Sequence, residues 1–208
     1  RPTFWLTGID EVSGKPWGFS PEMVRQGAQN RTTTDNTNIQ SRITLRPIEG
    51  LEIKGTYTFR RIVEDDFYHV NTYEMANATS GSGITFKYRN DPNSLRKTAL
   101  FNDYNNAAIT GTYTKVLADD HNFKLMLGYS QENSRVSEFW AQRQKLISDD
   151  IPSLNLATGN QVADDDITTW ALRSGFSRLN YNYKGKYLFE FVSRYDGSSR
   201  FQKGNRFV

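Results

Sequence analysis

The sequence lacks several features that would point to common classes of protein. None of its 208 residues is cysteine, which excludes disulfide bonds and thiolate metal sites within it. The net charge is only +3, so the basic surface typical of nucleic-acid-binding proteins is missing and no nucleic-acid partner is expected. It contains no run of about eighteen apolar residues, which excludes a transmembrane helix.

Both ends of the sequence look cut. The chain begins Arg1-Pro2-Thr3, without an initiator methionine or an apolar leader, and it stops in mid-pattern at Val208. We therefore expect a piece of a longer mature chain, with the signal peptide outside it.

What the sequence does contain is alternation of apolar and polar residues. The mean hydropathy of −0.69 is common in soluble proteins. A membrane β-barrel, however, turns only alternate residues toward lipid, so the average does not distinguish a soluble protein from such a barrel. In one segment, Leu51 and Ile53 fall on one face and Glu52 and Lys54 on the other, as in a strand with one apolar face. Six segments show this pattern: 39–46, 51–60, 107–114, 123–130, 170–183 and 187–194.

The connections between these segments alternate between short and long. Because strand direction reverses at each connection, all short turns lie at one end of the sheet and all long loops at the other. This asymmetry is typical of outer-membrane barrels. The short turns are expected at 47–50, 117–122 and 184–186, and the long loops near 1–38, 62–104 and 133–169, with a hairpin arm at 84–88.

Aromatic residues gather near both ends of the apolar faces. Amphipathic rings prefer the two interfaces of a membrane, so two aromatic belts favour a transmembrane barrel over a soluble sheet. Open strand edges are not tolerated in hydrocarbon, so further strands must lie outside this sequence. The belts would be Tyr113, Phe123, Tyr181, Tyr183 and Tyr187 beside the short turns, and Phe59, Tyr129 and Tyr195 at the other end.

Two other interpretations stay open at this point. A soluble β-sandwich that binds carbohydrate would alternate just as well, with the aromatic faces packed in a core. A glycosidase would need a pair of carboxylates placed for acid–base chemistry, and the sequence places none.

The end of the sequence carries a more specific signal. It contains an Arg-Leu-Asn-Tyr-x-Tyr strand, a short Lys-Tyr turn and an Arg-x-Asp-Gly-Ser-Ser-Arg-Phe strand end. These motifs resemble the barrel of SusC/RagA-type TonB-dependent outer-membrane transporters of Bacteroidetes, and 45–59 is similar to another hairpin of that family. The matching residues are Arg178, Leu179, Asn180, Tyr181, Tyr183, Lys186, Tyr187, Arg194, Asp196, Gly197, Ser198, Ser199, Arg200 and Phe201.

The resemblance implies an all-β fold: an antiparallel transmembrane β-barrel of which about six strands are present, within a 22-stranded, plugged barrel of the bacterial outer membrane. It also implies import of an oligosaccharide or a peptide, energised by TonB acting through the missing N-terminal part. The implied partners are a SusD-like surface lipoprotein and outer-membrane lipid. The whole of 1–208 would then belong to the barrel domain, without plug or signal peptide and without enzymatic activity.

Some residues are candidates for a functional role. Aromatic rings beside the long loops suit sugar stacking or contact with a partner protein, or they pack the loops on one another: Phe67, Tyr68, Phe139, Trp140 and Trp170. The family motif is expected to be structural, with Arg194 and Asp196 forming an ion pair at a strand end. The polar wall facing the barrel interior is expected to contain Glu52, Lys54, Thr56, Arg60, Lys124, Glu190 and Arg194.

No cofactor is expected. Acidic residues cluster at Asp149-Asp150 and Asp164-Asp165-Asp166, and loop carboxylates can bind calcium. The spacing of a calcium loop is absent, however, so a solvated loop is the favoured interpretation. His69 and His121, the only histidines, have no partner pattern near them in the sequence.

Overall fold

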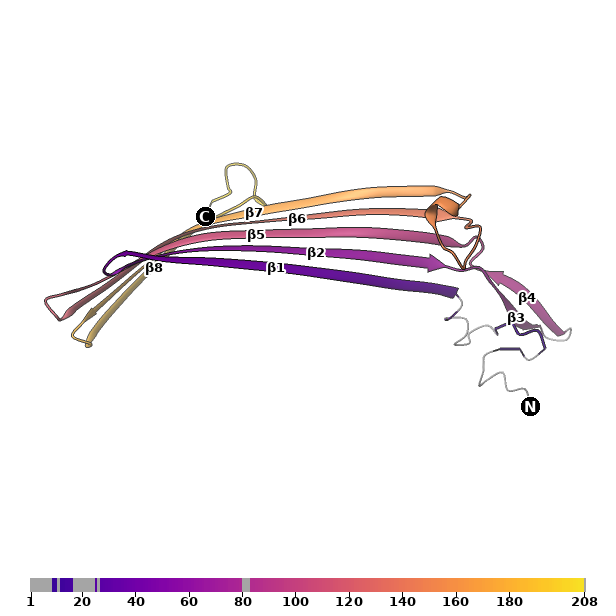
Figure 1. Ribbon diagram of the computed structural model, residues 1–208, viewed down its shortest axis with the longest axis horizontal. Coiled ribbons are helices and arrows are strands. Elements are labelled where there is room, and N and C mark those ends of the chain that lie inside the picture. Colours follow the sequence, from indigo (N-terminus) through magenta and orange to yellow (C-terminus); the bar gives the residue numbers. More distant parts are fainter. Residues whose placement is uncertain (1–8, 11, 17–24, 26, 80–82, 208) are drawn as a thin grey trace. The chain divides into compact units, whose positions relative to one another are not determined.

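The computed structural model describes residues 9–10, 12–16, 25, 27–79 and 83–207. Figure 1 shows six long strands side by side in the order β1-β2-β5-β6-β7-β8, while β3 and β4 pair with each other. The predicted all-β, antiparallel fold is confirmed. The elements are β1 (Ala28–Ile48), β2 (Leu51–Val70), β3 (Tyr73–Thr79), β4 (Gly83–Arg89), β5 (Ser94–Leu117), β6 (His121–Gln144), the 3-10 helix η1 (Leu154–Leu156), β7 (Gln161–Tyr183) and β8 (Tyr187–Ser198).

The short turns form where the sequence predicts them. Gly50 has φ of 80°, and a Cβ on it would lie 2.3 Å from the carbonyl oxygen of Thr114, so this position requires glycine. Lys184 and Gly185 both have positive φ, which gives a tight hairpin turn the twist of its flanking strands. The predicted hairpin arm is also confirmed, as β3 paired antiparallel with β4.

The strands are longer than the alternation predicted, so the loop bounds given by the sequence were too wide. Part of the first predicted loop, namely 1–8, 11, 17–24 and 26, lies outside the described residues. The segments that belong to strands instead are 28–38, 62–70, 94–104, 133–144 and 161–169. They escaped prediction because apolar and polar residues do not alternate regularly in them, while the pairing itself is made by backbone groups of neighbouring strands. Their extracellular location stays a prediction.

The chain divides into two compact units, each described by itself. Unit 1 comprises Arg1–Thr34, Glu64–Leu100 and Glu138–Asp166, and unit 2 comprises Asp35–Val63, Phe101–Ser137 and Ile167–Val208.

In unit 2, odd-numbered and even-numbered strand residues form two chemically different faces. The pairing of β7 with β8 places Leu179 opposite Phe191 and Tyr181 opposite Phe189. Asn180 and Glu190 are paired on the other face. We call the odd-numbered side the apolar face and the even-numbered side the polar face. The predicted division of each strand into an apolar and a polar face is therefore confirmed for this hairpin.

The apolar face of unit 2 is exposed. Leu127, Phe191 and Tyr187 have 56%, 53% and 70% of their surface accessible. In the part of the chain that the structure describes, unit 2 contains no buried hydrophobic side chain. The carbohydrate-binding sandwich is therefore wrong, because it requires these aromatic faces to be packed in a core.

Unit 1 contains a small hydrophobic core. Leu95 of β5, Leu146 and Ala157 are buried together, with Phe67 and Leu154 packed against them. The connection from 145 to 160 thus folds back over β2 and β5.

Candidate functional site

Tyr104 is the centre of a polar network on the polar face of unit 2. Its hydroxyl donates a hydrogen bond to Oε2 of Glu132 and accepts one from Nδ2 of Asn106, at 3.2 Å. The guanidinium of Arg60 lies over its ring, 5.4 Å from the centroid. Of these four residues the sequence predicted only Arg60, because the others are brought together by pairing between strands.

Trp170, one of the predicted contact residues, adjoins this network. Its ring centroid lies 6.3 Å from that of Tyr104, and the guanidinium of Arg200 lies 5.4 Å from its ring. Trp170 lies on strand β7, in agreement with the predicted strand 170–183. Two aromatic rings flanked by charged groups make a surface that can stack on a planar or sugar ring and hydrogen-bond its polar substituents.

Other residues of the predicted polar wall are also paired. Glu52 receives hydrogen bonds from Arg46, the shorter at 2.6 Å, and its other oxygen lies 3.5 Å from Nζ of Lys54. Asn180 donates a hydrogen bond to Glu190. On the polar face the charge of Glu52 is therefore compensated within the sheet, and that of Glu190 is hydrogen-bonded.

The motif at the end of β8 is held by interactions within unit 2. Nε of Arg194 lies 2.9 Å from both carboxylate oxygens of Asp196, and the same guanidinium reaches the hydroxyl of Ser174. Ser199 pairs twice with Ala171, through its backbone N–H at 2.9 Å and through its hydroxyl oxygen, which accepts from the Ala171 N–H at 2.8 Å.

The remaining motif residues take part in the sheet and its end. Tyr181 and Tyr187 belong to an aromatic group on the apolar face beside the turn, in which Phe123 lies 4.7 Å from Tyr181 between ring centroids. Gly197 is covered by the ring of Phe207, which would clash with any Cβ there. Ser198 forms a backbone hydrogen bond with Arg206. These placements account for glycine, serine and aromatic positions of the motif in structural terms. Arg178 lies on β7, and Arg200 and Phe201 follow the end of β8.

In unit 1, Phe67 and Phe139 line one cavity of about 390 Å³ between β1, β2, β5 and β6. Both lie on strands, although the sequence placed them beside loops. The guanidinium of Arg31 and the ammonium of Lys97 lie 5.4 and 5.8 Å from the ring of Phe67.

The other two predicted aromatics do not line this cavity. Trp140 carries the guanidinium of Arg96 at 4.1 Å from its ring, which occupies one ring face. Tyr68 is 42% exposed on β2.

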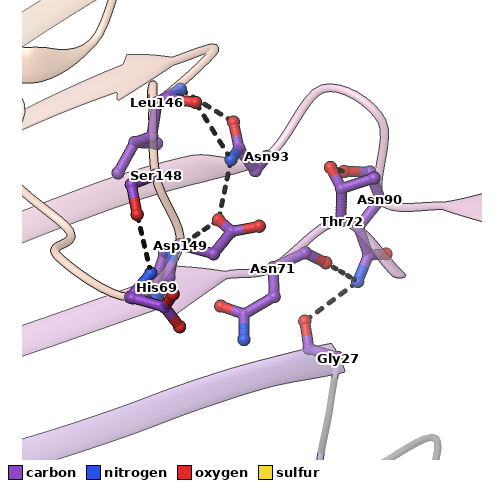
Figure 2. Close-up of polar contacts among 10 residues, drawn as sticks. Gly27, His69, Asn71, Thr72, Asn90, Asn93, Leu146, Ser148 and Asp149 are labelled. Atoms are coloured by element: carbon purple, nitrogen blue, oxygen red, sulfur yellow. Dashed lines mark hydrogen bonds and ion pairs between the residues drawn. The ribbon is translucent and has the colours of Figure 1, made fainter. Parts of the chain in front are cut away.

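A buried polar cluster fastens the connection between β6 and β7 in unit 1 (Figure 2). Nε2 of His69 lies 3.0 Å from Oδ1 of Asp149, and Nδ2 of Asn93 donates to the same oxygen at 2.7 Å. Asn93 also bonds both the N–H and the carbonyl of Leu146. The sequence missed this cluster because Asp149 is eighty positions from His69. Similarly, His121 contacts Tyr181 across sixty positions.

The two acidic clusters considered for calcium lie in different structural settings. Asp149 is bonded to His69 and Asn93, while Asp164–Asp166 lie within β7. Among the residues that the structure describes, no three His, Cys, Asp or Glu side chains gather in a group that could hold a metal ion. Within the same residues, no helix is long and apolar enough to cross a membrane.

Known proteins resemble this chain in sequence and in fold. No protein-family model matches the chain. TonB-dependent receptor P3 of Formosa agariphila is 28% identical over 208 residues, which covers 99% of this chain and 19% of that receptor. TonB-dependent receptor SusC of Bacteroides thetaiotaomicron is 60% identical over 35 residues, or 17% of this chain and 4% of the receptor. The solved RagAB peptide transporter superposes with a TM-score of 0.79 at 18% identity, covering 96% of this chain and 21% of that one.

The chain resembles the SusC/RagA-type TonB-dependent receptors, as its final segment predicted. Its six-stranded antiparallel sheet has the fold of part of a barrel like that of the solved transporter, as the sequence predicted. The chain spans about a fifth of the length of the first TonB-dependent receptors that it matches.

Proposed function

We propose that the chain forms part of the wall of an outer-membrane transporter that imports an oligosaccharide or a peptide. In this proposal, TonB energises uptake through a part of the receptor outside this sequence, and a SusD-like lipoprotein covers the receptor at the cell surface. The observation that carries the proposal is the division of unit 2 into an exposed apolar face and a polar face with paired charges.

The apolar face fits contact with hydrocarbon. Exposed side chains such as Leu127 and Phe191 would be unfavourable in water, and their contiguity across several strands exceeds what a soluble monomer normally exposes. Aromatic rings at both ends of this face, including Tyr187 beside a turn and Tyr129 at the other end, match the two interfaces of a membrane.

The polar face fits the wall of a hydrated interior. Arg60, Tyr104 and Glu132 satisfy one another, so the wall keeps its shape when water, a plug or a substrate lies against it. The relatives that match are receptors and transporters, which supports passage of a substrate and not its chemical conversion.

Membrane placement is tested by cysteine scanning along β6 in a cysteine-free form of the full-length receptor. We expect a water-soluble maleimide to modify Lys124→Cys and Met126→Cys on the polar face in intact membranes, and to leave Leu125→Cys and Leu127→Cys unmodified. Equal modification of neighbouring positions would contradict the placement of the apolar face in lipid.

Uptake is tested in a strain from which the receptor gene is deleted. Growth on oligosaccharide or peptide mixtures as the sole nutrient should fail for one of the two classes, return with the full-length receptor and remain absent when TonB is also deleted. Growth that does not depend on the receptor for either class would contradict the importer.

A further inference from the structure

The apolar face of unit 2 is hollowed by a groove of about 390 Å³. Tyr57 of β2 and Tyr129 of β6 form its two sides, and Ala107 of β5 lies between them. The groove forms because the small side chain of Ala107 lies between two large tyrosine side chains of the neighbouring strands. Ile109 continues the floor toward the rest of the apolar face.

The pairing of the strands explains this arrangement. Thr114 bonds Gly50, and Arg61 contacts Asp103, so β2 and β5 keep the same register from one contact to the other. Counting along both strands from these contacts brings Ala107 opposite Tyr57. The bond between Tyr104 and Glu132 brings Ala107 opposite Tyr129 in the same way. The three residues therefore form one row across the sheet.

The chemistry changes along the groove. At one end Ile109 is 53% exposed and apolar. At the other end the hydroxyl of Tyr57 donates to Oδ1 of Asn105 at 2.8 Å, and that of Tyr129 lies 3.3 Å from Oε1 of Gln131. In both contacts the side-chain oxygen of the amide residue is the hydrogen-bond acceptor.

The amide nitrogens are the groups that remain available to a ligand. Within the described part of the chain, neither Nδ2 of Asn105 nor Nε2 of Gln131 donates a hydrogen bond. Farther along the same two strands, Arg61 and Asp103 lie 3.5 Å apart and offset each other. A ligand that fits would therefore combine a hydrocarbon chain with uncharged acceptor oxygens, such as the carbonyls of an ester.

We propose that this groove binds one acyl chain of a membrane lipid, with the ester carbonyls of the lipid accepting hydrogen bonds from Asn105 and Gln131. The inference rests on the proposed placement of the apolar face in a membrane. A lipid is favoured over a second protein because the apolar end of the groove is continuous with the apolar face, and its polar end offers donors without net charge.

The test uses the full-length receptor, purified in mild detergent and titrated with a diacyl phosphatidylethanolamine under native mass spectrometry. Ala107→Leu fills the groove and should reduce the fraction of receptor that retains lipid by about tenfold, since roughly two methylene groups of contact are lost. Gly111→Leu is the matched control: it lies on the same face of the same strand, and nothing lies within 4 Å of a Cβ at that position. It should leave retention unchanged.

A dialkyl ether phosphatidylethanolamine tests the polar end of the groove. It has the same chains and headgroup but no ester carbonyl, so we expect it to be retained several-fold less well than the diacyl lipid. Asn105→Leu should reduce this difference, and the double variant Asn105→Leu with Gln131→Leu should abolish it. Equal retention of ester and ether lipids by the unchanged receptor, occupancy of the groove by detergent alone, or a mass matching a protein partner would each overturn the proposal.

The outcome is separable from that of the proposed function. If the receptor fails to insert or its cysteine pattern does not alternate, the membrane placement is wrong. If it inserts and supports growth but Ala107→Leu and Gly111→Leu retain lipid equally, only the groove assignment is wrong.

Discussion

The two units use the same strands but are stabilised differently. Unit 1 has buried hydrophobic residues, such as Leu95 and Leu146, and a buried polar cluster around Asn93. Unit 2 has neither an apolar core nor buried hydrophobic side chains among its described residues, and its large apolar side chains are exposed. Unit 1 is therefore built as a protein in water is built, whereas unit 2 needs an apolar solvent to cover one face.

Two phenylalanines allow the sharpest test of this comparison. Phe139 in unit 1 and Phe191 in unit 2 are both odd-numbered strand residues, and each is 53% exposed. Phe191 lies midway between Tyr187 and Tyr195, so we place it near the bilayer centre. Phe191→Arg should lower the free energy of unfolding in lipid vesicles by about 2–4 kcal/mol.

Phe139→Arg is the matched variant and should change that free energy by no more than about 0.5 kcal/mol, as expected of a surface position in water. Urea titration of the full-length receptor in vesicles measures both. Equal losses for the two variants would mean that the units do not differ in their solvent.

The buried cluster of unit 1 should have the next largest effect. Asn93→Ala removes the acceptor of the buried Leu146 N–H and a donor to the carboxylate of Asp149, which should cost about 2 kcal/mol. The amide of Leu146 should then exchange faster with deuterium. Asn155→Ala, in the same connection but exposed, should leave exchange unchanged, and similar rates in the two variants would show that the cluster does not fasten the connection.

A glycine on the polar face of unit 2 should have a smaller effect. A Cβ on Gly128 would lie 2.2 Å from the ring of Phe176, so Gly128→Ala must displace that ring and should cost about 1 kcal/mol. Gly111→Ala, where a Cβ meets nothing within 4 Å, should be nearly neutral. Phe176→Leu should relieve the cost in a double variant, and unfolding titrations that show no coupling would contradict this packing.

The family motif should have the smallest effect. Ser199→Ala removes the hydroxyl that accepts from Ala171 but keeps the backbone bond between the two residues, so we expect a loss of about 0.5 kcal/mol. Ser193→Ala, an exposed position of β8, serves as the reference. If Ser199→Ala leaves stability unaltered but reduces uptake, the serine contacts the substrate or a partner and is not structural.

The sequence predicted unit 2 far better than unit 1, for a physical reason. Residues such as Leu51, Glu52 and Ile53 alternate because the two faces of the strand differ in polarity, and this period is visible locally. Around Arg31 and Lys97 the strands show no regular alternation, so they are specified by backbone pairing with residues far away in the chain. The same limit applies to His69, whose partner Asp149 is supplied by a distant connection.

Of the candidate site, the sequence identified types of residue better than their arrangement. Phe67 and Phe139 do share a cavity, and Trp170 does adjoin a polar network. Tyr104 and Glu132 gave no signal, because a tyrosine and a glutamate in polar segments become a pair only when β5 and β6 align. Their roles in binding stay predictions.

The pairing of β7 with β8 has one continuous register, which fixes the face on which each residue lies. Twelve consecutive partners, from Leu172 with Ser198 to Tyr183 with Tyr187, follow one another without interruption. A single inserted residue in either strand would exchange the two faces of everything beyond it and turn charges toward hydrocarbon, whereas two inserted residues would restore the faces. Genetic changes of length should therefore be tolerated in this hairpin only by even numbers of residues, but by any number in the connection from 145 to 160.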